Sequence, residues 1–329
     1  MKAAEIQSFG LDGLGLVARP DPKPLQSSEV LVQIKAASLN YRDLMMAKGE
    51  YNPRQPLPLI PCSDGAGEVI AVGSEVTDFQ KGDKVAGLLP QTWIAGEPLK
   101  EHFKHTLGGP LDGMLCEYRV FPESGLIKVP DYLSYEEAAT LPCAALTAWR
   151  ALFVEAQLRP GETVLLQGTG GVALFALQFA KMAGARVVIT SSSDEKLERA
   201  RQMGADQLIN YRTTPEWSRG LQVDLILELG GAGTLLESLK AIKQGGQINL
   251  IGRLTPGGVN IDPVSIFMRH VRLQGVFVGN KADFQAMNQA LKQHQIKPVI
   301  DRVFELEQTR EAFTCLESAQ HMGKIVIKI

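Results

Sequence analysis

The sequence predicts an α/β protein in which a doubly wound parallel sheet interrupts a β-rich domain. Up to about residue 120, short β-like runs alternate with turns rich in proline and glycine, which is typical of an irregular β-barrel or sandwich. From about residue 135, strand-like and helix-like stretches alternate, which favours a parallel sheet covered by helices. Residues 324–329 return to a β-like run, so we expect the β-rich domain to be split.

The composition is that of a globular protein of about two domains. The chain has 329 residues, 45% of them hydrophobic, and a net charge of −2, so no basic surface suggests nucleic acid as a partner. No apolar run approaches the roughly 20 residues that span a bilayer, and the first residues lack a signal peptide's apolar segment. Scattered cysteines without a CxxC pair fit a reducing compartment. We therefore expect a cytoplasmic protein without a nucleic-acid or membrane partner.

The individual elements follow from local patterns. Strands of the β-rich domain are expected at 30–36, 67–72, 84–88 and 116–121. Ser134 and Glu137 have the spacing of a capping box, which predicts a helix there. The alternating region predicts strands at 163–167, 186–190, 207–210, 223–228, 247–250 and 273–278, and helices at 172–183, 195–203, 234–241 and 283–293. Glycines 184, 204 and 245 are expected to end helices. These patterns predict domain segments 1–122, 123–295 and 296–329, the middle one binding a dinucleotide.

The most informative stretch runs from residue 161 to residue 173, where an apolar strand enters a glycine turn and a helix follows. Gly168 permits the tight turn, Gly170 lets the backbone approach a pyrophosphate, and Ala173 lets the helix pack on the strand. The start of the helix then directs free N–H groups at the phosphates. The alternative is an ordinary tight loop without a ligand. The expected cofactor-binding residues here are Gly168, Thr169, Gly170, Gly171 and Val172.

Four further motifs precede this turn in a fixed order: LNYRD at 39–43, GAGEVIAVG at 65–73, GDKV at 82–85 and ATLPCAALTA at 139–148. With these motifs, nearly the whole chain resembles the medium-chain dehydrogenase/reductase superfamily, in its zinc-independent, quinone-oxidoreductase-like branch. The resemblance implies a split GroES-like catalytic domain, a Rossmann domain, a nicotinamide cofactor and hydride transfer. We expect the active site in the cleft between the two domains, where ligands commonly bind.

The resemblance also predicts that catalytic zinc is absent. Zinc-dependent relatives bind the metal through Cys, His and Cys with a nearby Glu, whereas this sequence has Asn40, Ser63, Cys143 and Asp64 at those positions. A catalytic zinc needs about three protein ligands, and a single thiol cannot hold it. Cys143 is then expected to be a small buried residue of the site. A rebuilt metal site remains an alternative, with ligands from Cys62, Asp64, His102 or His105.

The residues after the strand at 186–190 favour NADPH over NADH. NAD-binding proteins usually place Asp or Glu at this strand end to hold the ribose 2′-hydroxyl. Here Ser191 and Ser193 can hydrogen-bond a 2′-phosphate, and the resemblance implies that Lys196 and Tyr211 hold it. The neighbouring Asp194 keeps NADH open. Alternatively, Lys196 is only a solvated lysine at the start of a capped helix.

The resemblance places Asn40 and Thr147 at the nicotinamide ribose or the substrate. Asn40 can orient a carbonyl or a hydroxyl, or can merely bond its own loop backbone. Tyr41 and Tyr51 are candidate hydrogen-bond donors to a substrate carbonyl, with packed aromatic residues as the alternative. Trp93 either lines the cleft or anchors a loop.

Two later strand ends complete the expected cofactor site. The resemblance implies that the loops at Leu250 and Gly252, and at Val278 and Asn280, hold the nicotinamide. In relatives the strand at 273–278 often pairs across a dimer, so we expect a homodimer.

The sequence therefore predicts a zinc-free, NADPH-dependent reductase that transfers hydride to a small electrophile such as a quinone or an enone. Without a Lewis acid, conjugated acceptors are favoured over simple alcohols. Two alternatives remain: an alcohol dehydrogenase with a degenerate zinc site, and a non-catalytic NADPH-binding sensor or adaptor.

Overall fold

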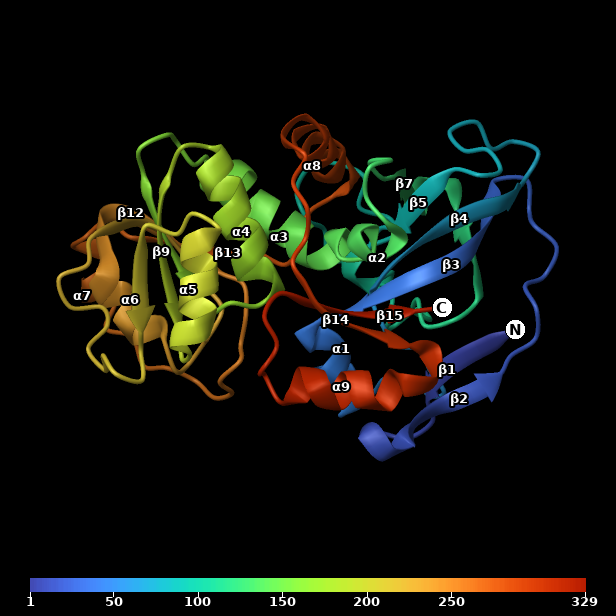
Figure 1. Cartoon of the computed structure of the whole chain (residues 1–329), viewed down its shortest axis with the longest axis horizontal. Helices are drawn as coiled ribbons and strands as arrows, with labels where there is room; N and C mark the ends of the chain where they lie inside the picture. Colours follow the sequence, from blue (N-terminus) through green and yellow to red (C-terminus); the bar gives the residue numbers. More distant parts are fainter. The chain divides into compact units, whose positions relative to one another are not determined.

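The computed structural model describes all 329 residues, and its contacts divide the chain into two compact units (Figure 1). The first unit comprises Met1–Leu146 and Gly279–Ile329, and the second comprises Thr147–Val278. The first unit is therefore discontinuous in sequence, as the β-like end of the chain predicts. This division assigns residues 123–146 and 279–295 to the first unit, whereas the domain segments predicted from the sequence assign them to the dinucleotide-binding domain.

The first unit is built on a seven-stranded sheet with the order β14-β15-β3-β4-β5-β7, in which β6 also pairs with β3. A separate hairpin joins β1 and β2. The strands are β1 Lys2–Ile6, β2 Leu14–Ala18, β3 Glu29–Leu39, β4 Asp64–Val72, β5 Lys84–Gly87, β6 Tyr118–Pro122, β7 Leu126–Lys128, β14 Ile300–Glu305 and β15 Lys324–Lys328. The helices are α1 Tyr41–Ala47, α2 Tyr135–Ala138, α8 Lys281–His294 and α9 Thr309–Glu317.

Strand β3 is the centre of this sheet, and its sequence shows why. Val30, Val32 and Ile34 alternate with less buried residues and are at most 1% exposed, so one face of the strand meets the core. The last strand of the chain, β15, pairs antiparallel with β3, with Ile325 opposite Leu39. This register places Lys324 beside the carboxyl end of β3, where α1 begins.

The second unit is a six-stranded parallel sheet with the order β10-β9-β8-β11-β12-β13. In chain order this is 3-2-1-4-5-6, the arrangement of a Rossmann domain. Its strands are β8 Thr163–Gln167, β9 Arg186–Ser191, β10 Gln207–Asn210, β11 Val223–Glu228, β12 Ile242–Leu250 and β13 Arg272–Gly275. Its helices include α4 Gly171–Met182, α5 Asp194–Gln202, α6 Leu235–Ala241 and α7 Val264–Phe267, and α3 Leu146–Trp149 leads the chain into it.

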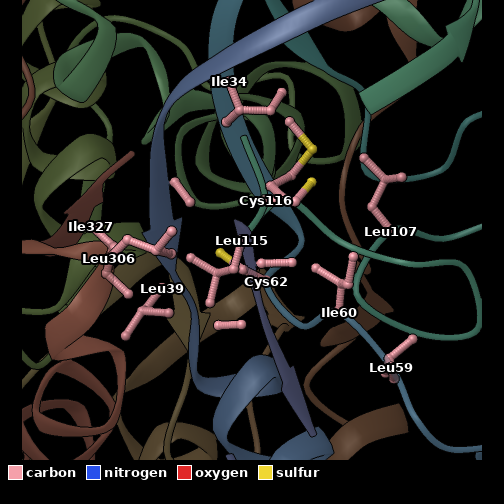
Figure 2. Packing of buried hydrophobic residues seen from close by; sticks show 14 of the residues in the cluster. Ile34, Leu39, Leu59, Ile60, Cys62, Leu107, Leu115, Cys116, Leu306 and Ile327 are labelled. Atoms are coloured by element: carbon pink, nitrogen blue, oxygen red, sulfur yellow. The ribbon is translucent and has the colours of Figure 1, made fainter. Parts of the chain in front are cut away.

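Each unit has its own hydrophobic core. In the first unit, buried side chains of β3, β15 and the loops around Cys62 and Leu115 pack together (Figure 2). In the second unit, Leu165 of β8 and Ile226 of β11 pack against α6 through Leu235 and Leu239. The central strands of the parallel sheet are apolar on both faces, as expected when helices cover both.

Most predicted elements are present, with three differences. Helix α6 ends at Ala241, so Gly245 lies within β12 and does not end a helix. Strand β13 stops at Gly275, short of the predicted end at residue 278. Helices α1, α7 and α9 and strands β1, β2, β7 and β14 were not predicted. None of the helices combines the length and apolar character needed to cross a lipid bilayer.

Candidate functional site

The glycine turn of the second unit has the geometry of a phosphate cradle. Gly168 follows β8 with a φ of 75°, a conformation that favours glycine. Gly170 is the N-cap of α4, and no side chain caps the free N–H groups of the first turn of this helix. A Cβ atom added at Gly168 or Gly170 would meet nothing within 4 Å. The backbone therefore faces open space at a helix N-terminus, which suits a pyrophosphate.

A buried polar network ties the ends of β8 and β11 together below this turn. Gln167 Nε2 donates to Glu228 Oε2 and Ser238 Oγ, each at 2.8 Å, and its Oε1 accepts the N–H of Gly230 at 3.1 Å. The Glu228 carboxylate is fully buried and also accepts hydrogen bonds from the hydroxyls of Thr234 and Ser238. The two strands lie side by side where the strand order reverses, which is where open α/β sheets bind ligands. The sequence analysis did not predict this network, although polar residues at the ends of two apolar strands were a visible signal.

The expected 2′-phosphate residues gather at the ends of β9 and β10. Ser193 is the N-cap of α5, and its Oγ accepts the N–H of Lys196 at 3.3 Å. Ser191 is buried and its carbonyl accepts the Tyr211 N–H, while the Tyr211 side chain is 43% exposed. Asp194, which kept NADH open, accepts a hydrogen bond from Asn210 Nδ2 at 2.7 Å. The structure thus brings all five residues to one edge of the sheet.

The other two expected cofactor loops differ from each other. Leu250 ends β12, and a Cβ at Gly252 would lie 2.5 Å from Leu229 O, so this loop needs glycine for close packing. Val278 is fully buried. Asn280 is the N-cap of α8, where its side chain accepts from Asp283 N and donates to Gly96 O. The polar atoms of Asn280 therefore have structural partners within the first unit.

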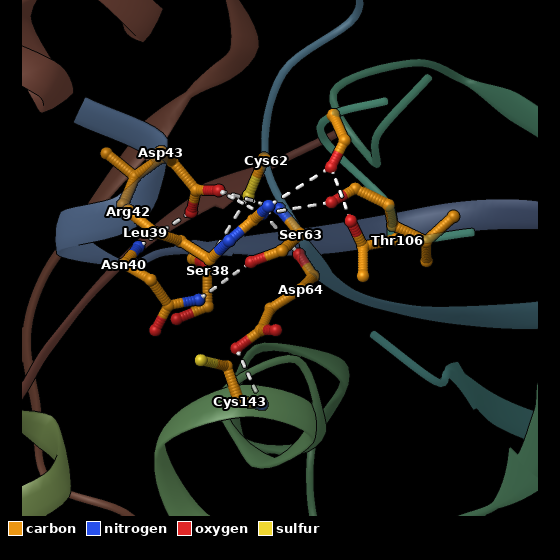
Figure 3. Close-up of polar contacts among 12 residues, drawn as sticks. Ser38, Leu39, Asn40, Arg42, Asp43, Cys62, Ser63, Asp64, Thr106 and Cys143 are labelled. Atoms are coloured by element: carbon orange, nitrogen blue, oxygen red, sulfur yellow. Dashed lines mark hydrogen bonds and ion pairs between the residues drawn. The ribbon is translucent and has the colours of Figure 1, made fainter. Parts of the chain in front are cut away.

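A second candidate site lies in the first unit, where α1 follows β3 (Figure 3). Asn40 Nδ2 donates to Ser63 Oγ at 3.2 Å. The Lys324 Nζ donates to Leu39 O at 2.6 Å and to Asn40 Oδ1 at 2.5 Å. These bonds fix the Asn40 amide, with its oxygen accepting from Lys324 and its nitrogen donating to Ser63. The side chain of Asn40 therefore bonds more than the backbone of its own loop. Lys324 is only 3% exposed, so the cluster contains a buried cation.

Two buried carboxylates lie in the same cluster. Asp43 Oδ1 accepts a hydrogen bond from the Ser63 N–H at 3.0 Å. The same oxygen lies 3.4 Å from Arg42 Nη1, with which it forms an ion pair. Asp64 Oδ2 accepts the Cys143 N–H at 3.2 Å, whereas Asp64 Oδ1 is buried without a hydrogen-bond partner. Burial raises the pKa of Asp64 to about 7, although Lys324 and Asn40 act to lower it. A carboxyl of this kind can exchange a proton near neutral pH.

The two cysteines of this region are poor nucleophiles in this environment. Burial raises the pKa of Cys143 to about 12, so its thiol is protonated at neutral pH. Cys62 is fully buried and has a φ of 77°, which is uncommon for a residue other than glycine. This turn positions Ser63 and Asp64, the next two residues in the chain. Backbone in a sparsely populated conformation often lies at functional sites.

The expected aromatic residues have different environments. Tyr41 begins α1 and is 38% exposed, and Tyr51 is 39% exposed with its ring 5.0 Å from the Arg42 guanidinium. Thr147 is buried on α3. Trp93 anchors the loop at 91–107, because it is 1% exposed, its Nε1 donates to Gly96 O, and its ring stacks on His102. The two tyrosines thus keep exposed surface, and Trp93 serves its own loop.

Both units of this chain match known protein families. The family described as alcohol dehydrogenase GroES-like domain matches residues 26–131, and the family described as zinc-binding dehydrogenase matches residues 171–293. A zinc-type alcohol dehydrogenase-like protein of Schizosaccharomyces pombe is 43% identical over 321 residues, which cover 94% of this chain and 93% of the relative. The chain belongs to the medium-chain dehydrogenase/reductase superfamily. It is an NAD(P)H-dependent oxidoreductase with a GroES-like domain and a Rossmann domain.

Members of the superfamily with different activities resemble this chain to similar extents. A 2-methylene-furan-3-one reductase of Solanum lycopersicum is 31% identical over 335 residues, covering 99% of this chain and 79% of the relative. The crystal structure of an NAD-dependent alcohol dehydrogenase superposes on this chain with a TM-score of 0.91 at 32% identity, and the match covers 100% of both chains.

A metal site would need several His, Cys, Asp or Glu side chains close together. Nowhere in the structure do three or more His, Cys, Asp or Glu side chains gather in a way that could hold a metal ion. The alternative ligands Cys62, Asp64, His102 and His105 do not form such a group either. Asn40, which the resemblance places at the first zinc-binding cysteine, bonds Ser63 and Lys324.

Proposed function

We propose that this oxidoreductase is zinc-free and uses NADPH to reduce a quinone, an enone or a related carbonyl compound. The observation that carries the proposal is the hydrogen-bonded set Lys324, Asn40 and Ser63. The resemblance implies that Asn40 and Ser63 stand where zinc-dependent relatives have metal ligands, and here their side chains bond each other and Lys324. A buried ammonium group supplies the positive charge there. We further propose that the protein acts in the cytoplasm as a homodimer.

The second unit fits a nicotinamide dinucleotide. The open face of Gly168 and Gly170 leaves room for a pyrophosphate at the start of α4. Serine hydroxyls, Lys196 and Tyr211 at the ends of β9 and β10 suit a 2′-phosphate, and the carboxylate of Asp194 is already bonded to Asn210. When bound, the reduced nicotinamide supplies the hydride.

The residues of the first unit supply binding and proton chemistry. A conjugated ketone gains a hydride at its β-carbon and a proton at its α-carbon or oxygen, so a proton donor is needed. The hydroxyls of Tyr41 and Tyr51 are candidates, since both side chains keep exposed surface. Asn40, fixed by Lys324, offers an oriented amide for a hydroxyl or a carbonyl. Positioning and exclusion of water would then supply most of the rate enhancement.

The test is an assay of chelator-treated enzyme with matched substrates. NADPH oxidation is followed with a small enone, a quinone and, in the reverse direction, a primary alcohol with NADP⁺, while elemental analysis measures bound zinc. We expect enone or quinone reduction that neither EDTA nor added zinc changes. Stoichiometric zinc and loss of alcohol oxidation on chelation would instead establish a zinc-dependent alcohol dehydrogenase. Tight NADPH binding without turnover on any substrate would favour a sensor.

The tyrosines are tested in the same assay. Replacing Tyr41 or Tyr51 by Phe removes only the hydroxyl, so NADPH affinity should stay the same. If one of them donates the proton, its Phe variant should lose roughly 10²–10⁴-fold in kcat, the range typical of general acid catalysis. Unchanged turnover in the double variant would leave solvent as the proton source.

A further inference from the structure

We infer that Asn210 is a specificity-determining residue for the cofactor, because it holds the carboxylate of Asp194. The inference deepens the proposed use of NADPH and rests on that proposal. Asn210 is the last residue of β10 and lies opposite Ser191 of β9 in the parallel register. Asp194 is the first residue of α5, the helix that follows β9. The sheet therefore brings an amide and a carboxylate together from two separate segments.

The orientation of the Asn210 amide is fixed from both sides. Its Nδ2 donates to Asp194 Oδ1 at 2.7 Å, and its Oδ1 accepts the N–H of Arg212 at 3.0 Å. Because the backbone N–H can only donate, the amide oxygen must face Arg212 and the NH₂ group must face Asp194. A hydrogen bond to a carboxylate is stronger than one between neutral groups, so Asp194 is held in this orientation.

The hydrogen bond between Asn210 and Asp194 affects cofactor choice because of where Asp194 lies. An acidic side chain near the end of the second Rossmann strand is the usual ligand of the ribose 2′-hydroxyl in NAD-binding proteins, and it repels a 2′-phosphate. Strand β10 lies on the side of β9 away from β8, the strand that leads into the glycine turn. Asn210 therefore holds the carboxylate toward the outer edge of the sheet. Ser191, Ser193, Lys196 and Tyr211 lie at the same strand ends and suit a phosphate.

The experiment measures binding, not turnover. Dissociation constants of 2′,5′-ADP and 5′-AMP, and of NADPH and NADH, are determined by calorimetry for the full chain and for Asn210→Ala. Loss of the amide frees Asp194, so the preference for the 2′-phosphorylated ligand should fall about tenfold, the order expected for one hydrogen bond to a charged group. Gln207→Ala is the matched control, because Gln207 begins the same strand and bonds only Arg186. This variant should keep the wild-type ratio.

A second pair of variants separates the inference from a general disturbance of the fold. In an Asp194→Asn background no carboxylate remains to be held, so Asn210→Ala should no longer change the ratio of the two affinities. An equal loss for both ligands in Asn210→Ala, or the same change in ratio with and without the carboxylate, would overturn the inference. The wild-type ratio tests the proposed cofactor separately: a wild type that prefers 5′-AMP refutes NADPH use, while the shift between variants still tests Asn210.

Discussion

Asp64 is a single residue whose charge is costly in its environment. Its carboxyl is fully buried, one oxygen has no hydrogen-bond partner, and Lys324 is the main cation that offsets the negative charge. Burial raises the pKa to about 7 from an ordinary 3.8. The folded state therefore holds this proton more tightly than the unfolded chain does. Its contribution to stability is complete below about pH 4 and is lost as the pH rises through 7.

Replacing Asp64 by Asn should remove this pH dependence. At pH 4 and below the two proteins should have similar free energies of unfolding, because Asp64 is then protonated in the folded state and largely protonated in the unfolded chain as well. At pH 8 the Asn variant should be more stable, by on the order of 2–4 kcal/mol, since no charge is buried. Urea unfolding at both pH values measures this difference. Parallel curves for the two proteins from pH 5 to 8 would contradict the assigned pKa.

Removing Lys324 should destabilise the protein where removing the Asp64 charge stabilises it. Lys324→Met leaves Leu39 O and Asn40 Oδ1 without a donor and the Asp64 charge without its main cation, so we expect a loss of about 3–5 kcal/mol at pH 8. Combining it with Asp64→Asn should cost less than the sum of the two single changes, because the uncompensated charge is gone. Urea unfolding of the four proteins in the cycle measures the coupling. Strict additivity would show that the two groups act independently.

At the level of elements, local patterns predicted the strand, turn and helix from 163 to 183 almost to the residue. This unit was predictable because its glycines, apolar strand and apolar helix are contiguous in sequence. The prediction that Gly245 ends a helix was wrong because a glycine can also lie within an irregular strand. Only the pairing of β12 with β11 shows that Gly245 belongs to a strand. Lys324 was missed for the same reason, since it lies 284 residues from Asn40 and only the β15–β3 register brings the two together.

The turn between β8 and α4 offers a test in which folding and binding separate. Gly170 has a φ of −79°, which other residues adopt, and its missing Cβ would meet nothing within 4 Å. Gly170→Val should therefore fold, at a cost of about 1 kcal/mol for a poorer N-cap. Its side chain would occupy the space that the pyrophosphate needs, so NADPH affinity should fall by roughly 100-fold or more. Fluorescence titration measures the affinity, and a thermal melt serves as the control. Wild-type affinity would show that the cofactor binds elsewhere.

At the scale of the whole molecule, the parallel sheet of the second unit ends in a strand with one open edge. Strand β13 pairs only with β12, and an open edge is a template for pairing with another chain. The segment before β13 exposes large apolar side chains: Leu254, Val264, Phe267 and Met268 are 53%, 49%, 59% and 64% exposed. A cluster of this kind beside an open edge favours contact with a second copy, and a two-fold axis would bring identical edges together.

Phe267→Glu tests this assembly. The charge would lie beside the edge strand, so we expect the dimer dissociation constant to rise at least about tenfold, equivalent to about 1.4 kcal/mol. Leu99→Glu is the matched control, because Leu99 is 61% exposed but belongs to the loop at 91–107 of the first unit. Sedimentation velocity over a range of concentrations should show dimers for the wild type and the control and a shift toward monomers for Phe267→Glu. A monomeric wild type, or equal behaviour of the two variants, would refute pairing through the edge of β13.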